Sequence, residues 1–155
     1  MAKPDGGERV LARNRKAFFQ YQVLERVEAG IALVGTEVKS LREGGLSFSD
    51  SYVEYRDGQL FLVGCRIAPY SHGNLMNHSP DRERKLLLHK REIEKLGGKV
   101  IGKGLTLIPL RAYLHRGRVK LEIGLGRGKR AHDKRETIKR RDIERETRQA
   151  LRDRG

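Results

Sequence analysis

The sequence contains only one cysteine and no long apolar run, and each of these features excludes some classes of protein. A single cysteine can form neither an intramolecular disulfide nor a cysteine-based zinc site. Cys65 lies in a strand-like run at 61–65, which predicts a small core residue. No apolar run approaches the roughly 20 residues of a membrane span. Residues 1–14 also lack the apolar segment of a secretory signal. These features predict a reduced, cytoplasmic protein.

Patterns that carry catalysis or bind metals are also missing. The five histidines, at positions 72, 78, 89, 115 and 132, form no His-x-x-x-His pair and have no adjacent acidic ligands, so we expect no metal and no cofactor. There is no Gly-rich phosphate cradle, serine nucleophile elbow or Cys/His pair. The only acidic group near a strand that resembles the metal site of a two-metal nuclease consists of Asp50, Glu54 and Asp57. Asp57 belongs to a turn and Asp50 suits a strand entry, so we expect no enzyme.

Positive charge is what the chain has in excess. Its 155 residues carry a formal charge of +14, of which residues 127–155 supply +6 and residues 1–126 the remaining +8. A body and a tail that are both basic indicate one large anionic ligand, and RNA, DNA and an anionic membrane all qualify. A membrane is the weakest of the three, because the tail lacks the broad apolar face of an interfacial helix.

The C-terminal segment 127–155 cannot build a core of its own. Only five of its residues are apolar: Ala131, Ile138, Ile143, Ala150 and Leu151. Too little burial is available to offset the entropy of ordering, so the free segment is expected to be disordered. It has no proline and no glycine between Gly128 and Gly155, so nothing prevents a helix from forming on a polyanionic partner.

Residues 14–126 read as one β-rich domain after a flexible N-terminus at 1–13. We predict strands at 19–27, 31–34, 51–56, 59–66, 105–115 and 118–125. The predicted turns and loops are a turn at 28–30, hairpins at Asp57-Gly58 and Arg116-Gly117, and an exposed loop at 69–84. Pro109 indicates an edge strand or a bulge. Helices are predicted at 36–43, capped by Thr36, and at 85–96, ended by Gly97-Gly98. The predicted fold class is mainly β, a small antiparallel barrel of the oligonucleotide-binding (OB) type with short helices.

Three basic groups on this body are candidate phosphate contacts. They are Arg13/Arg15/Lys16, Lys39/Arg42 and Arg82/Arg84/Lys85. Any one group alone can be a solvated face, whereas three around one small barrel favour a continuous RNA footprint.

Two further features each have two interpretations that spacing alone does not separate. Phe18, Phe19 and Tyr21 suit either base stacking or core packing. Glu28 is either an ordinary polar turn residue or an acceptor for a base edge or a 2′-hydroxyl, a role closed to Lys and Arg.

Several motifs resemble one family, the small protein B (tmRNA-binding, SsrA-binding) proteins of bacterial trans-translation. They span nearly the whole chain in the family's order. The motifs are Asn14-Arg15-Lys16-Ala17, EAGIAL at 28–33, GTEVKSLREG at 35–44, Asp50-Ser51-Tyr52, RKLLLH at 84–89 and GRGKRAHDKR at 126–135.

The resemblance implies an OB-type barrel that binds the tRNA-like domain of tmRNA and enters stalled ribosomes. It implies a tail that becomes helical in the decoding centre and the empty mRNA channel. Further implied partners are the small ribosomal subunit and, through aminoacylated tmRNA, alanyl-tRNA synthetase and elongation factor Tu. We expect a monomer.

Site residues follow from the same resemblance. Asn14, Glu28 and Leu87 fall at tmRNA-binding positions, and Lys129 and Arg130 at the junction of barrel and tail. In the tail, His132 is expected to stack on a decoding-centre base, and Asp133, Lys134 and Arg135 to form the motif needed for tagging. Lys139, Arg140 and Arg141 continue the channel-contacting face.

One departure stands out. Phe18 and Phe19 replace the basic residue and the histidine that the family usually places after this Asn-Arg-Lys-Ala motif, so stacking would have to substitute for a polar contact. The alternative functions are a structural ribosomal protein or a general OB-fold RNA-binding protein, with a nuclease a distant third.

Overall fold

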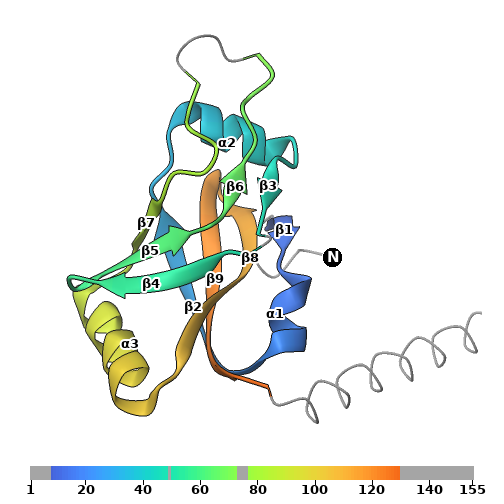
Figure 1. Cartoon of the computed structure of the whole chain (residues 1–155). Helices are drawn as coiled ribbons and strands as arrows, with labels where there is room; N and C mark the ends of the chain where they lie inside the picture. The colour runs from blue at the N-terminus through green and yellow to red at the C-terminus, as the bar shows by residue number, and fades with distance from the viewer. Residues whose placement is uncertain (1–7, 49, 73–76, 130–155) are drawn as a thin grey trace, which may run out of the picture.

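The computed structural model describes residues 8–48, 50–72 and 77–129, which form a mainly antiparallel β structure with three helices (Figure 1). Seven strands form one sheet in the order β1-β8-β9-β2-β7-β5-β4, and β3 pairs with β6. The sheet strands are β1 (Arg9–Arg13), β2 (Tyr21–Ile31), β4 (Tyr52–Arg56), β5 (Gln59–Val63), β7 (Arg84–Leu87), β8 (Thr106–His115) and β9 (Arg118–Gly128). The short pair is β3 (Leu46–Ser47) and β6 (Arg66–Ile67). The helices are α1 (Arg15–Gln20), α2 (Gly35–Arg42) and α3 (Lys90–Lys103).

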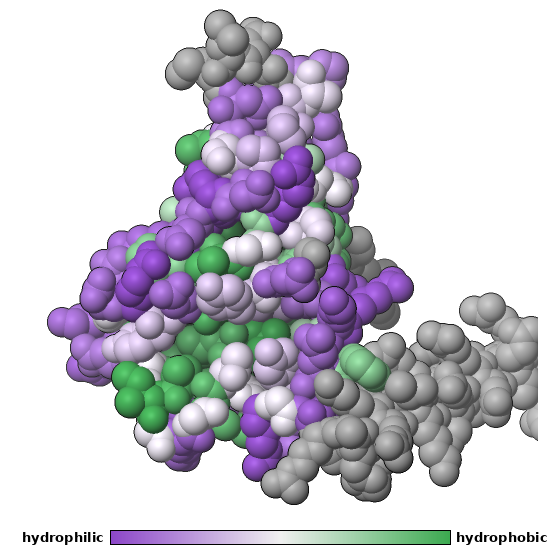
Figure 2. Space-filling view, viewed as in Figure 1, coloured by the Kyte–Doolittle hydropathy of each residue, from purple (hydrophilic) through white to green (hydrophobic). Residues whose placement is uncertain are grey.

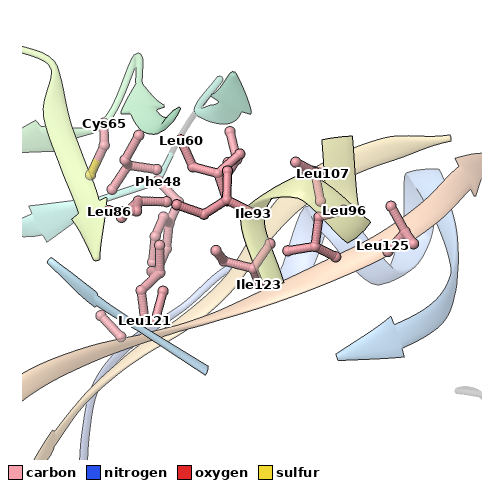
Figure 3. Close-up of a cluster of buried hydrophobic side chains, with 14 residues drawn as sticks. Phe48, Leu60, Cys65, Leu86, Ile93, Leu96, Leu107, Leu121, Ile123 and Leu125 are labelled. Atoms are coloured by element: carbon pink, nitrogen blue, oxygen red, sulfur yellow. The ribbon is translucent and has the colours of Figure 1, made fainter. Parts of the chain in front are cut away.

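The larger sheet bends strongly, so that the β4–β5 hairpin crosses in front of β2 and β9 and β4 contacts β8 (Figure 1). The core lies inside this bend, where Leu60, Leu86 and Leu121 of three strands meet Ile93 and Leu96 of α3 (Figure 3). No ladder joins β1 to β4 among the described residues, so the sheet is open at that point. Closure into a barrel therefore stays a prediction.

Cys65 is a core residue, as the sequence predicted. Its side chain is buried, and burial raises the pKa of the thiol to about 12. The thiol therefore stays protonated and packs as a small apolar group.

The surface is uneven in polarity. On the face where β4 and β5 cross, hydrophilic residues cover the α2 end, and apolar residues gather in the centre and beside α3 (Figure 2). Within the described ranges no helix is long and apolar enough to cross a membrane. The same ranges contain no cluster of three or more His, Cys, Asp or Glu side chains able to hold a metal ion.

Both predicted hairpins are confirmed. Asp57-Gly58 and Arg116-Gly117 have positive φ at both turn positions, as a two-residue hairpin turn requires. The predicted irregularity at Pro109 is also confirmed, because the register of β8 and β9 shifts between Pro109 and Arg111.

The predictions for the N-terminal third need three corrections. Residues 9–13 form β1 rather than a flexible segment, because they pair with β8. The strand predicted from residue 19 starts only at Tyr21, because residues 15–20 form α1, in which Ala17 packs against Ile108 and Leu110. The turn predicted at 28–30 is wrong, because β2 continues to Ile31 and pairs with both β9 and β7.

The helix predicted at 85–96 is wrong in both bounds. Residues 84–87 form β7, with Arg84 and Leu86 buried and the alternate residues exposed. The helix starts only at Lys90 and continues through Gly97-Gly98 to Lys103. Gly97 is required there because a Cβ at this position would lie 2.4 Å from the Tyr55 ring.

The helix predicted at 36–43 is confirmed as α2, although its N-cap is Val34 rather than Thr36. Glu37 Oε1 accepts a hydrogen bond from the Val34 amide at 2.9 Å, which satisfies one free donor of the first turn. At the other end of the domain β9 continues to Gly128, two residues beyond the predicted boundary at 126.

Candidate RNA interface

One face of the sheet carries two neighbouring rows of outward side chains. Arg111 of β8 lies opposite Glu122 of β9, which lies opposite Glu28 of β2. The next row runs across the same strands and reaches β7: Tyr113, Lys120, Gly30 and Leu87. Alternate strand residues share a face, so both rows point away from the core that contains Leu121 and Ile123.

Glu28 is an exposed carboxylate that the fold positions. Its Oε2 accepts a hydrogen bond from the Tyr113 hydroxyl. Burial and this hydrogen bond raise the pKa of Tyr113 above its ordinary value, so the hydroxyl remains a donor. Among the described residues Glu28 Oε1 has no hydrogen-bond partner. One oxygen is therefore fixed, and the other is available to accept from a ligand, as the functional interpretation of Glu28 requires.

A shallow groove adjoins Glu28. Besides Glu28, it is lined by Gly30, Leu87, Leu88, His89, Glu92 and Lys120. Leu87 is 51% exposed, so its apolar side chain is open to a ligand in the groove. A Cβ on Gly30 would lie 3.3 Å from Leu87 Cβ, so glycine keeps this part of the groove open. The groove thus offers an apolar surface, two carboxylates and an ammonium group within one small area.

Arg84 is not at the surface. It is fully buried and donates four hydrogen bonds to protein oxygens. The acceptors are Glu37 Oε2 at 2.7 Å, Cys65 O at 2.8 Å, Pro80 O at 3.1 Å and Ser79 O at 3.3 Å. The prediction that Arg84 contacts RNA phosphates is therefore wrong in this structure, since its donors are used inside the protein.

Arg82 and Arg84 share one carboxylate, that of Glu37. Glu37 is fully buried and accepts from Arg82 Nε at 3.1 Å as well as from Arg84. The cluster joins α2 to β7 and to the loop before it. Lys85 points to the opposite side of β7 and is exposed, so the cluster holds Lys85 and Leu87 in place beside α2.

The remaining basic candidates lie at the surface. Lys39 is exposed on α2, with its Nζ 5.5 Å from the Tyr70 ring centroid, and Arg42 is exposed at the end of the same helix. Arg15 and Lys16 are exposed on α1, and Lys16 Nζ lies 3.9 Å from Asp50 Oδ1.

Asn14 is 7% exposed and has a structural role at the start of α1. Its backbone amide donates to Leu110 O and its side-chain amide to Pro109 O, each at 2.8 Å. These bonds join the β1–α1 corner to the bulge of β8 and so orient Arg15.

Comparison with known proteins shows the family of this chain. The family described as SmpB protein matches residues 11–153, nearly the whole chain. The chain belongs to the SmpB family. The SsrA-binding protein of Oleidesulfovibrio alaskensis is 54% identical over 149 residues, which is 96% of each chain. That of Geobacter metallireducens is 53% identical over 149 residues, covering 96% of this chain and 97% of the relative.

A solved SmpB-family structure has the same fold. A chain of "tmRNA-SmpB: a journey to the center of the bacterial ribosome" is 50% identical, with a TM-score of 0.65. The match covers 82% of this chain and 93% of that one.

The described residues end at Lys129. Lys129 donates from its backbone to Gln20 O at 2.8 Å and from Nζ to Phe18 O at 2.9 Å, so Lys129 itself lies beside α1. The predicted tail residues lie outside the described residues: Arg130, His132, Asp133, Lys134, Arg135, Lys139, Arg140 and Arg141.

Three residues at or behind this candidate interface were not singled out from the sequence. Counting residues in both directions from the Arg116-Gly117 turn pairs Tyr113 with Lys120 and places both on the face of the sheet away from the core. Both residues could therefore have been found from the sequence. Glu37 had no comparable signal, because a carboxylate in the first turn of a helix is ordinarily exposed.

Proposed function

We propose that this protein is the tmRNA-binding adaptor of trans-translation. Its β domain binds the tRNA-like domain of tmRNA, delivers it to stalled ribosomes and so permits ribosome rescue and peptide tagging. The observation that supports this most is the family match over residues 11–153, which includes both the domain and the tail. The exposed Glu28–Leu87 groove on a body of net positive charge agrees with an RNA ligand.

The proposed tmRNA contacts fall in two regions of the domain. Glu28 and Leu87 line the groove, and Lys85 lies two residues before Leu87 on the same exposed face of β7. Lys39 and Arg42 lie on α2. Arg15, Lys16 and Lys129 lie around α1, where Asn14 orients the chain. Arg130 extends the α1 region. RNA of this kind is gripped mainly through backbone and shape, with few base-edge contacts.

The tail is proposed to act on the ribosome rather than on tmRNA. We assign His132, Asp133, Lys134 and Arg135 to the decoding centre and Lys139, Arg140 and Arg141 to the vacant mRNA channel. A helix over this segment would form where ribosomal phosphates offset its ordering entropy.

The rest of the proposal follows from this role. The protein would act in the cytoplasm as a monomer, without catalysis, and with a sheet that closes as an OB-type barrel. Through aminoacylated tmRNA it would meet alanyl-tRNA synthetase and elongation factor Tu.

Glu28→Ala tests the groove directly. We expect the affinity for a tRNA-like-domain transcript to fall about tenfold or more, since a hydrogen bond to a charged group contributes about 1.5–3 kcal/mol. Glu94→Ala is the matched control, because Glu94 is an exposed carboxylate on α3, away from the groove. Filter binding at fixed salt measures both. Equal affinities for Glu28→Ala and wild-type protein, with unchanged thermal unfolding, would reject the assigned contact.

A further inference from the structure

Phe18 and Arg26 lie at a small cavity beside Arg15, and no role has been given above to either of these two side chains. The Arg26 guanidinium lies over the Phe18 ring, 5.3 Å from its centroid, within the range of a cation–π contact. Both groups are solvent-accessible, since Phe18 is 38% exposed and the Arg26 side chain 57%. The cavity beside them is also lined by Arg13, Arg15 and Glu122.

Glu122 holds this stack in place. Its Oε1 lies 3.4 Å from Arg26 Nη1, and its Oε2 accepts from Arg111 Nε at 3.1 Å. Arg111 in turn lies over the Tyr113 ring, 4.3 Å from the centroid, and Tyr113 donates to Glu28. A continuous row of contacts therefore connects the Phe18 stack to Glu28 of the groove.

The charge around the cavity favours an anion. Arg111 and Arg26 share Glu122, and Arg111 also pairs with Glu8. Arg13 and Arg15 are exposed and form no ion pair with any residue in the described ranges. Two free guanidinium groups thus border a planar guanidinium–aromatic stack, which is the combination that binds an unpaired nucleotide.

We propose that Phe18 and Arg26 form a stacking site for one unpaired base of the bound RNA, with Arg13 and Arg15 binding the adjoining phosphate. The base would lie on the outer plane of Arg26, which Phe18 supports from below. This inference rests on the proposed function, since it adds a base-stacking site beside the groove. It also assigns a role to Phe18, one of the two residues at which the sequence departs from the family's usual motif.

Arg26→Lys is the most selective test, because lysine keeps the charge and removes the plane. We expect Arg26→Lys and Phe18→Leu each to weaken binding of a tRNA-like-domain transcript about tenfold, the loss expected for one stacked base. The dependence of affinity on salt should stay unchanged, whereas Arg15→Ala should lower its slope by about one. The matched control is Arg56→Lys, since Arg56 lies over the Phe61 ring at 4.3 Å but pairs with Glu54 and Glu83.

A second measurement starts with the wild-type protein, so its first part does not depend on the folding of any variant. Removing single bases from unpaired positions of the transcript should weaken binding of the wild-type protein at one position. In the second part, Arg26→Lys should cause no further loss on that abasic RNA. Wild-type affinity for Arg26→Lys and Phe18→Leu, with a loss for Glu28→Ala, would overturn the stacking site and leave the proposed function intact. Wild-type affinity in all three variants would reject the proposed interface together with the stacking site.

Discussion

At the residue scale, Glu37 connects the parts of the protein that surround the groove. Its carboxylate is fully buried and binds the Val34 amide, Arg82 and Arg84. Each partner belongs to a different segment, so this one side chain joins the start of α2 to β7. An isolated buried charge is costly, and only the complete set of partners makes this arrangement stable.

Glu37→Gln should therefore destabilise the fold by about 3–5 kcal/mol, because it leaves the buried Arg84 without a counter-charge. Urea unfolding followed by circular dichroism measures the change. Glu83→Gln is the control, since it removes a carboxylate that pairs with Arg56 at the surface, and it should have a much smaller effect. Similar losses in the two variants would contradict the structural role of Glu37.

The Glu37 carboxylate also predicts that the stability of the fold depends on pH. Burial alone would favour the protonated form, but hydrogen bonds from Arg82, Val34 and Arg84 outweigh it and hold the pKa of Glu37 below its ordinary value of 4.5. The stabilisation is therefore fully present above pH 4.5 and is lost as the pH falls through the lower folded-state pKa. The difference in stability between wild-type and Glu37→Gln protein should shrink in that acid range.

Residue roles were only partly predictable from the sequence. Glu28 and Leu87 were predicted to contact RNA, and the structure places both at one groove, while the contact itself stays a prediction. Arg84 was expected at the surface, because charged residues are mostly exposed. Its burial depends on Glu37, 47 positions away, and no local pattern indicates that pairing.

At the element scale, α3 contains two adjacent glycines with different surroundings. Gly97 faces the Tyr55 ring at a distance that excludes a side chain, whereas a Cβ on Gly98 meets nothing within 4 Å. Gly97→Ala should destabilise the fold by about 1–3 kcal/mol through overpacking. Gly98→Ala should instead stabilise it by about 0.5–1 kcal/mol, because alanine favours a helix.

Thermal unfolding of the two alanine variants, side by side, tests this contrast. Equal effects of the two substitutions would show that Tyr55 does not restrict α3 as the structure indicates.

Elements that depend on local sequence were predicted, and elements that depend on distant contacts were not. The two hairpins depend on turn residues with positive φ, which are local, and both were predicted. The Gly97-Gly98 pair looked like a helix end, but Gly97 is required by contact with Tyr55 of β4, which is distant in sequence. β7 was missed for a similar reason, because the run after Arg84 has helical spacing and becomes a strand only by pairing with β2 and β5.

At the scale of the whole molecule, positive charge is divided between a folded body and a terminal segment. The mainly antiparallel fold was predictable from composition, turn signals and family motifs together. The bend of the sheet and the row from Phe18 to Glu28 were not, since both arise from strand order. The proposed function assigns tmRNA selection to the body and ribosome engagement to residues beyond it.

The most direct test of that division is a chain truncated after Arg130, compared with the full-length protein. The retained part includes every strand, helix and groove contact of the described residues. We expect its affinity for the tRNA-like domain to stay within about threefold of the full-length value, while tagging of peptides on stalled ribosomes is abolished. Loss of tmRNA binding on truncation, or tagging that survives it, would contradict the account.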